Sequence, residues 1–206
     1  MKLYDSIGPN PRVVKMFMAE KGIDLPRVTV DLMAGENRQP AHVARNPGGQ
    51  MPTLELDDGR FLAEITAICE YLDEKHPDPP LIGTSAEERA MTRMWTRRVD
   101  LYIVEPMLTG FRGAEGFNLF KERMRLIPQA SADLKILAQE KITWLDGLIA
   151  GRDFIAGPRF TLADVLLFCT MDFGATVGQP VNRDNKNIAA WFDRVSARPS
   201  AAASKK

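Results

Sequence analysis

The chain has 206 residues, of which 45% are hydrophobic and 26% are charged, as is typical of a globular protein with a sizeable core. Its 27 Lys and Arg side chains balance its 27 Asp and Glu side chains, which disfavours nucleic acid and anionic membranes as partners. No basic segment leads into an apolar run at the start, and no later segment approaches the roughly 18 apolar residues of a membrane span, so we expect a cytoplasmic protein.

The first 32 residues predict a strand, a helix and a second strand. A short apolar run at residues 3–4 ends at the glycine and proline cluster of residues 8–11. Residues 12–21 have the wide apolar face of a helix, and Gly22 is placed to cap its end. Residues 28–32 are rich in β-branched side chains and predict a strand parallel to the first, because a helix lies between them.

The next segment predicts a short helix, a hairpin and a longer helix. The short helix covers about residues 39–45. Two strands, 53–56 and 60–63, flank an Asp-Gly pair that favours a tight antiparallel turn. Residues 65–74 form a helix that stops before Pro77. The predicted order of this α/β part is βαβαββα.

A proline-rich stretch over residues 77–85 is the predicted linker between two domains. The first domain covers residues 1–76. No strand pattern follows the linker, so we predict that residues 86–206 form an all-α domain.

Two capping boxes are expected in the second domain, one from Ser85 and Glu88 and one from Thr161 and Asp164. The second box precedes a very apolar segment, which indicates a buried central helix. The expected helices run from residue 86 towards residue 107, over residues 130–148, from residue 162 through 169, and over residues 188–195, followed by a frayed tail.

The cysteines and histidines give no sign of a metal site. Cys69 and Cys169 lie far apart within apolar helical patterns, which favours buried, reduced thiols. His42 and His76 have no partners at metal or triad spacing, and we interpret both as surface or helix-end residues.

Four segments, residues 35–38, 46–54, 62–72 and 160–164, together resemble the soluble glutathione transferases, especially the phi and theta types and related bacterial and fungal enzymes. The resemblance covers nearly the whole chain. It implies a thioredoxin-like N-terminal domain that binds glutathione, an all-helical C-terminal domain, and a homodimer with a polar interface patch at Arg97, Arg98 and Asp100.

The resemblance also assigns a glutathione site. It implies a cis Met51–Pro52 bond that offers the Met51 backbone to the cysteinyl unit of the ligand, and it places Glu64 at the γ-glutamyl ammonium. The family usually has a serine after this glutamate, whereas this chain has Ile65. The Ile65 N–H and the hydroxyl of Thr66 are left to hold the γ-glutamyl carboxylate, and we expect altered affinity.

Asn37, Arg38 and Gln50 fall where relatives hold the glycine carboxylate of glutathione. Arginine suits a carboxylate because its planar group can donate two parallel hydrogen bonds. A solvated Asn-Arg turn explains the first two residues equally well.

The sequence leaves three candidates for the group that activates the thiol. Counting back from the first helix, the serine of the theta type falls on about Gly8, which has no side-chain donor. Ser6 and Asn10 are the remaining side-chain candidates, with Asn10 preferred slightly, and backbone N–H groups at the helix start are a third possibility.

The resulting hypothesis is a glutathione transferase that joins the glutathione thiolate, as co-substrate, to a small hydrophobic electrophile, without a metal. One alternative is a glutathione-dependent disulfide reductase or peroxidase, and another is a noncatalytic binding or regulatory protein with the same fold. Side chains that could border the electrophile are Tyr102, Met107, Phe111 and Arg112. An amphipathic long helix explains these residues equally well.

Overall fold

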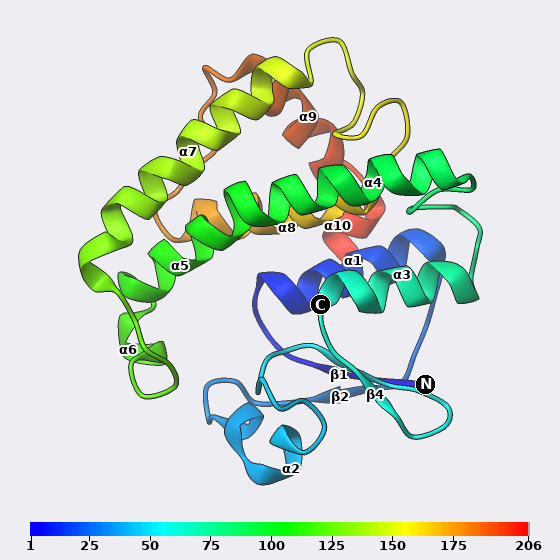
Figure 1. Cartoon of the computed structure of the whole chain (residues 1–206), viewed down its shortest axis with the longest axis vertical. Coiled ribbons are helices and arrows are strands. Elements are labelled where there is room, and N and C mark those ends of the chain that lie inside the picture. Colours follow the sequence, from blue (N-terminus) through cyan, green and yellow to red (C-terminus); the bar gives the residue numbers. More distant parts are fainter. Residues whose placement is uncertain (206) are drawn as a thin grey trace. The chain divides into compact units, whose positions relative to one another are not determined.

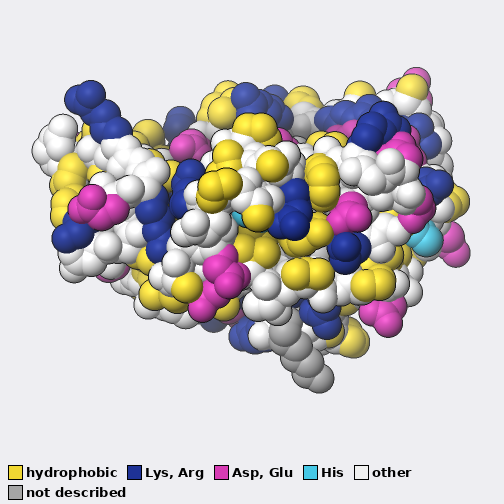
Figure 2. Space-filling view, turned by 90° about the horizontal axis from the view of Figure 1, so that it is seen from below, with side chains coloured by type: hydrophobic (Ala, Val, Ile, Leu, Met, Phe, Trp, Pro, Cys, Tyr) yellow, Lys and Arg dark blue, Asp and Glu magenta, His cyan; other side chains and the backbone are white. Residues whose placement is uncertain are grey.

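The computed structural model describes residues 1–205, which divide into two compact units. Unit 1 contains residues 1–80 and 199–205, and unit 2 contains Leu81–Arg198. On the face drawn in Figure 2, acidic and basic side chains are interspersed, in keeping with the balanced composition. Within residues 1–205, no helix is both long enough and apolar enough to cross a membrane.

Unit 1 is built on a mixed sheet with the strand order β2-β1-β3-β4. The central strand β1 is parallel to β2 and antiparallel to β3, and β4 is antiparallel to β3. The strands are β1 (Lys2–Asp5), β2 (Arg27–Thr29), β3 (Thr53–Glu55) and β4 (Phe61–Leu62). This topology confirms the predicted thioredoxin-like order.

Two longer helices cover one face of the sheet in unit 1, and a short helix lies on the other face (Figure 1). The longer helices are α1 (Pro9–Lys21) and α3 (Ile65–Lys75), and the opposite face carries η1 (Glu36–Arg38) and α2 (Pro40–Val43). The core of this unit consists of fully buried apolar side chains, including Leu3, Phe17, Leu54, Ile68 and Leu72.

Helix α1 begins three residues earlier than the sequence predicts, within the glycine and proline cluster. Gly8 precedes the helix with a φ of 114°, a value that favours glycine. Pro9 and Pro11 then occupy the first turn, where a missing N–H removes no intrahelical bond. The cluster therefore starts the helix and does not extend the loop.

The prediction for the C-terminal tail is wrong in two respects. Residues 199–205 belong to unit 1 and not to the helical domain predicted over residues 86–206. They form the short helix α10 (Pro199–Ala203), which packs on α1 where Arg12 Nε donates to Ser204 Oγ at 3.2 Å. Ser200, Ala201 and Ser204 are buried, so tertiary contacts order a tail that the sequence pattern suggested was frayed.

Unit 2 is entirely helical in its regular structure. Its elements are α4 (Ala86–Val99), the π-helical η2 (Asp100–Val104), α5 (Glu105–Gly113), α6 (Phe117–Phe120), η3 (Pro128–Ala130), α7 (Ser131–Leu148), α8 (Leu162–Thr176) and α9 (Lys186–Ser196). Helix α8 is the predicted buried helix, with every residue from 162 to 171 buried. Cys69 in unit 1 and Cys169 in α8 are buried, as predicted.

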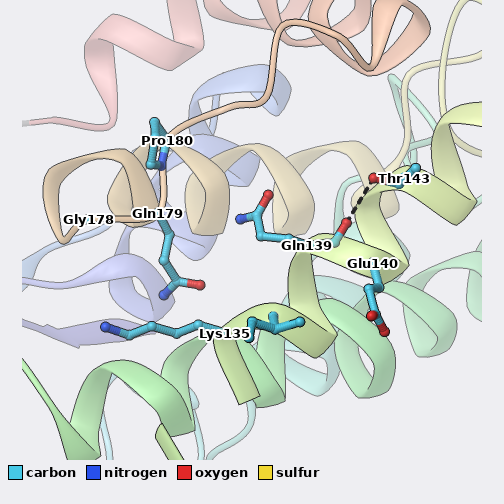
Figure 3. A pocket seen from close by; sticks show the side chains of 8 residues that line it. Lys135, Gln139, Glu140, Thr143, Gly178, Gln179 and Pro180 are labelled. Atoms are coloured by element: carbon cyan, nitrogen blue, oxygen red, sulfur yellow. Dashed lines mark hydrogen bonds between the residues drawn. The ribbon is translucent and has the colours of Figure 1, made fainter. Parts of the chain in front are cut away.

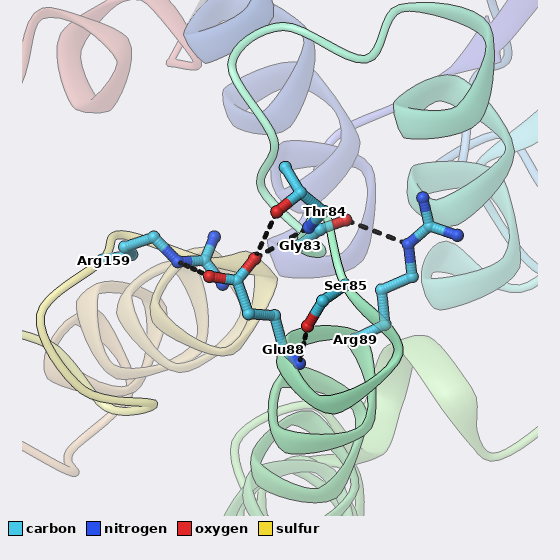
Figure 4. Close-up of polar contacts among 6 residues, drawn as sticks. All are labelled: Gly83, Thr84, Ser85, Glu88, Arg89 and Arg159. Carbon is cyan, nitrogen blue, oxygen red and sulfur yellow. Dashed lines mark hydrogen bonds and ion pairs between the residues drawn. The ribbon is translucent and has the colours of Figure 1, made fainter.

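The start of α4 uses the predicted pair in a modified form (Figure 4). Ser85 Oγ accepts a hydrogen bond from the Glu88 N–H at 3.2 Å, as in a capping box. The Glu88 carboxylate, however, accepts from the N–H and hydroxyl of Thr84, both at 2.8 Å, and pairs with Arg159 at 3.4 Å. The Glu88 carboxylate thus accepts from the N–H of Thr84, whereas in a standard capping box it would accept from the N–H of Ser85.

Asp164 joins three segments of unit 2. Its carboxylate accepts from the N–H of Thr161 and the N–H of Ile155, both at 2.9 Å, and from Trp191 Nε1 at 2.8 Å. The predicted Thr161–Asp164 capping box is confirmed. Burial raises the pKa of Asp164 to about 6, although the hydrogen bonds that it accepts oppose this shift.

Candidate glutathione site

An unpaired backbone edge lies immediately before β3. The Met51–Pro52 peptide bond is cis, as predicted. The β1–β3 ladder ends at the Tyr4–Thr53 pair, so Met51 lies beyond it. Within residues 1–205, neither the N–H nor the C=O of Met51 has a hydrogen-bond partner. The Met51 side chain is buried against Tyr4 and Val30, which fixes the residue in place while its peptide groups stay available.

The start of α3 offers a second set of unpaired groups. No side chain caps this helix, so the N–H groups of its first turn, beginning with Ile65, have no intrahelical partners. Unpaired N–H groups at a helix start attract anions. The side chains of Ile65 and Thr66 are half-buried, and the Thr66 hydroxyl makes no hydrogen bond within the described part of the chain.

Glu64 is held in a costly conformation at the same place. Its φ is 69° and its ψ is 119°, and it is the only residue other than glycine with a positive φ within residues 1–205. Such a conformation costs about 1–3 kcal/mol and is found mainly at functional sites. Glu64 is exposed and immediately precedes the unpaired N–H groups of α3, so a negative side chain and positive backbone dipoles belong to adjacent residues here.

Asn37 and Arg38, two of the residues predicted to bind the glycine carboxylate, brace a loop. Asn37 is buried, and its amide donates to the Gly49 carbonyl at 2.7 Å. Arg38 Nη1 donates to the Gly48 carbonyl at 3.1 Å. The exposed side chain of Gln50 follows in the same loop, immediately before Met51. The side chains of Asn37 and Arg38 thus hold the loop that leads to the unpaired edge at Met51. Their direct contact with a ligand stays a prediction.

His42 was predicted to lie on the surface or at a helix end, and the first of these placements is wrong. It lies in the short helix α2 with only 2% of its surface exposed. Its Nε2 is 3.2 Å from the carbonyl oxygen of Gln50, which also accepts from Asn46 Nδ2 at 3.0 Å. No local periodicity marks His42 as buried, because the Gln50 loop that folds over it is irregular. His76 is exposed at the end of α3, as predicted.

The two predicted side-chain candidates for thiol activation differ in availability. Ser6 is buried, and its hydroxyl donates its one proton to the Val30 carbonyl at 2.7 Å. Asn10 is half-buried in the first turn of α1, and its amide has no hydrogen-bond partner within residues 1–205.

The third possibility, a backbone donor, leads to the same residue. Pro9 and Pro11 carry no N–H, and the Arg12 N–H donates to the Gly8 carbonyl at 3.3 Å. Asn10 therefore supplies the one remaining N–H of the first three helical residues.

Comparison with known proteins identifies the family. Residues 7–75 match the model of the glutathione S-transferase N-terminal domain, and residues 114–199 match that of the C-terminal domain. The chain belongs to the glutathione S-transferase family. It is 30% identical to glutathione S-transferase 2 of Saccharomyces cerevisiae over 208 residues, which cover 97% of this chain and 87% of that protein.

One solved structure agrees with the fold of this glutathione S-transferase family member, and one further relative is named for another activity. The crystal structure of Gtt2 from Saccharomyces cerevisiae superposes with a TM-score of 0.92 at 30% identity, covering 99% of this chain and 100% of that one. The maleylacetoacetate isomerase of Pseudomonas aeruginosa is 42% identical over 156 residues, which cover 75% of this chain and 71% of that protein. The relatives thus include a transferase and an isomerase.

The surface has two hollows that Met51 does not line. One, of about 600 Å³, lies at the ends of β1 and β2 and has Ile7 and Met33 on its rim, 61% and 62% exposed. The other, of about 610 Å³, lies in unit 2 between α7 and residues 178–180 (Figure 3). No residue predicted from the sequence to bind glutathione lines the second hollow. Within residues 1–205, no three His, Cys, Asp or Glu side chains are grouped to hold a metal ion.

Proposed function

We propose that this family member is a cytoplasmic glutathione transferase, which joins the glutathione thiolate to a small hydrophobic electrophile. The observation that carries the proposal is the unpaired N–H and C=O of Met51 beside the cis bond to Pro52. An extended peptide binds such an edge by adding two antiparallel backbone hydrogen bonds. The cysteinyl unit of glutathione has the N–H and C=O that complete this pair.

The ends of glutathione match the charges around that edge. The γ-glutamyl carboxylate suits the unpaired N–H groups at the start of α3, and the neighbouring ammonium suits Glu64. The glycine carboxylate suits Arg38 and the side-chain amide of Gln50. Because Arg38 also holds the Gly48 carbonyl, we expect its contribution to ligand binding to be modest.

In the reaction we assign to Asn10 the donor that stabilises the sulfur anion. A free thiol has a pKa near ~8.5, so a hydrogen bond from the protein increases the thiolate fraction at neutral pH. The thiolate sulfur then forms a bond to the electrophilic carbon. In a substitution, the bond from that carbon to the displaced group breaks and its electron pair leaves with the group. In an addition, the π electron pair of the substrate moves away from the carbon that is attacked. The protein supplies proximity and orientation for this step.

For the electrophile we propose an apolar surface in unit 1 that includes Ile7, next to the β1–α1 turn. Exposed apolar side chains of this size are candidates for contact with a hydrophobic substrate. In unit 2, Met107 lies fully in the core, and Phe111 packs edge-on against Phe120 and Phe173. Of the other two members of the predicted set, Tyr102 is 43% exposed and Arg112 is half-buried.

We also propose that the protein is a homodimer that uses an aromatic surface of unit 2. Tyr102 and Trp144 are 43% and 40% exposed, and their ring centroids are 6.0 Å apart in an edge-on contact. Of the polar residues expected at an interface, Arg97 pairs with Asp100 at 3.3 Å, and Arg98 stacks on Trp95. Sedimentation equilibrium measures the mass, and a monomer at micromolar concentration contradicts the dimer.

A glutathione-dependent isomerase is the second candidate, because the relative with 42% identity is named an isomerase. The two activities differ in whether glutathione is consumed. The test is a millimolar glutathione assay with 1-chloro-2,4-dinitrobenzene and, separately, with a cis-enedione acid. We expect a conjugate, detected by its mass, from the first substrate. Turnover of the second substrate alone, without loss of glutathione, would replace the transferase proposal with the isomerase.

A further inference from the structure

The carbonyl group of Gln50 is held by two side chains at once. His42 Nε2 lies 3.2 Å from this oxygen and Asn46 Nδ2 lies 3.0 Å from it, so both of its lone pairs are engaged. Asn46 is itself fixed, because its Oδ1 accepts from the Gly48 N–H at 3.1 Å and its amide also reaches Thr53 Oγ1 at 3.3 Å. The direction of the Gln50 carbonyl is therefore set by the protein.

This direction determines where the next N–H points. The Gln50 C=O and the Met51 N–H belong to one planar, trans peptide group, in which they point in opposite directions. Holding the carbonyl towards α2 consequently aims the Met51 N–H away from α2. That N–H is one of the two backbone groups at the proposed glutathione edge, and it has no partner within residues 1–205.

The hydrogen bond from His42 Nε2 leaves the other ring nitrogen without a partner in residues 1–205, which costs free energy. Since Nε2 faces a carbonyl, it carries the ring proton, and Nδ1 is left as an acceptor. Nδ1 is buried and has no donor within the described residues. A phenyl ring has a similar shape and would fill the site without an unpaired nitrogen. Packing alone therefore does not explain an imidazole at this position.

We propose that His42 is a positioning residue, which aims the Met51 N–H at the cysteinyl unit of glutathione through the Gln50 carbonyl. The proposal rests on the proposed function. The group that the Met51 N–H would bind is the peptide backbone of a thiol tripeptide. This backbone makes the same hydrogen bond before and during the reaction. Loss of positioning then weakens glutathione binding and leaves the chemical step unaffected.

The experiment compares wild type with His42→Phe, which keeps the ring shape, and His42→Gln, which keeps a donor near the Nε2 position. His76→Phe is the matched control, because His76 is exposed at the end of α3. We expect His42→Phe to raise the KM for glutathione about 3- to 10-fold with kcat within about twofold, and His42→Gln to restore most of the loss. The control should match the wild type.

A second measurement does not depend on a folded variant. The ¹⁵N shifts of the wild-type His42 ring should report the Nε2–H tautomer, and the Met51 amide proton should move downfield when glutathione is added. Wild-type affinity in His42→Phe, equal losses in both variants, or an Nδ1–H tautomer overturns the proposal for His42 and leaves glutathione binding intact. Failure of the wild type itself to bind millimolar glutathione overturns the proposed function and this proposal together.

Discussion

Glu64 allows backbone strain and ligand binding to be separated with two substitutions. Its φ of 69° is costly for any residue with a Cβ atom, and glycine avoids that cost. Glu64→Ala keeps the strain and loses the carboxylate, whereas Glu64→Gly loses both. We expect the glycine variant to be more stable than the alanine variant by about 1 kcal/mol, after allowance for the greater freedom of glycine in the unfolded chain. For a chain of this size that corresponds to a Tm about 2–4 °C higher.

The effect on ligand binding is expected to be the same in both variants. Each removes the carboxylate proposed to meet the glutathione ammonium, and a hydrogen bond between charged groups contributes about 1.5–3 kcal/mol. The Kd for glutathione should therefore rise about 10- to 100-fold in both, measured by isothermal titration calorimetry alongside thermal unfolding.

The control is Glu74→Ala, an exposed glutamate near the other end of α3, which should change neither quantity. Unchanged glutathione affinity in the two Glu64 variants would refute the binding role. An alanine variant more stable than the glycine variant would refute the strain.

Two further predictions concern the thiol donor and the buried carboxylate. Ser6→Ala should cost about 1 kcal/mol of stability and leave kcat within about twofold, because its proton is already donated, whereas Asn10→Ala should lower kcat about 10- to 100-fold. The opposite ranking in steady-state assays would exchange their roles. Burial raises the pKa of Asp164 to about 6, so its contribution to stability is fully present below the unfolded pKa near 3.8 and is lost as the pH rises through 6. The unfolding free energy of wild type relative to Asp164→Asn should thus fall by about 2 kcal/mol between pH 4 and pH 7 in urea titrations, and a pH-independent difference would contradict the shift.

Features set by local sequence could be predicted, and features set by distant contacts could not. The hairpin from residue 53 to residue 62 and the Thr161–Asp164 box follow from side chains a few positions apart, and both are present in the structure. Helix α10 has no sequence pattern of its own and is ordered by contacts such as the one from Arg12 to Ser204, 192 positions apart.

The site shows the same division. The cis bond before Pro52 could be predicted from the family resemblance, which depends on a motif of adjacent residues. The engagement of the Ser6 hydroxyl depends on the way β1 and the chain after β2 come together at Val30, and the burial of His42 depends on an irregular loop. Neither arrangement follows a periodic sequence pattern. The sequence therefore placed His42 at the surface or at a helix end, and it left Ser6 open as a candidate for thiol activation.

The most direct test of the account is a crystal structure of the protein with glutathione. We predict that the N–H and C=O of Met51 lie about 3 Å from the C=O and N–H of the cysteinyl unit, with the γ-glutamyl end at Glu64 and the start of α3. Glutathione bound at another place, with the Met51 peptide groups still unpaired, would contradict the account.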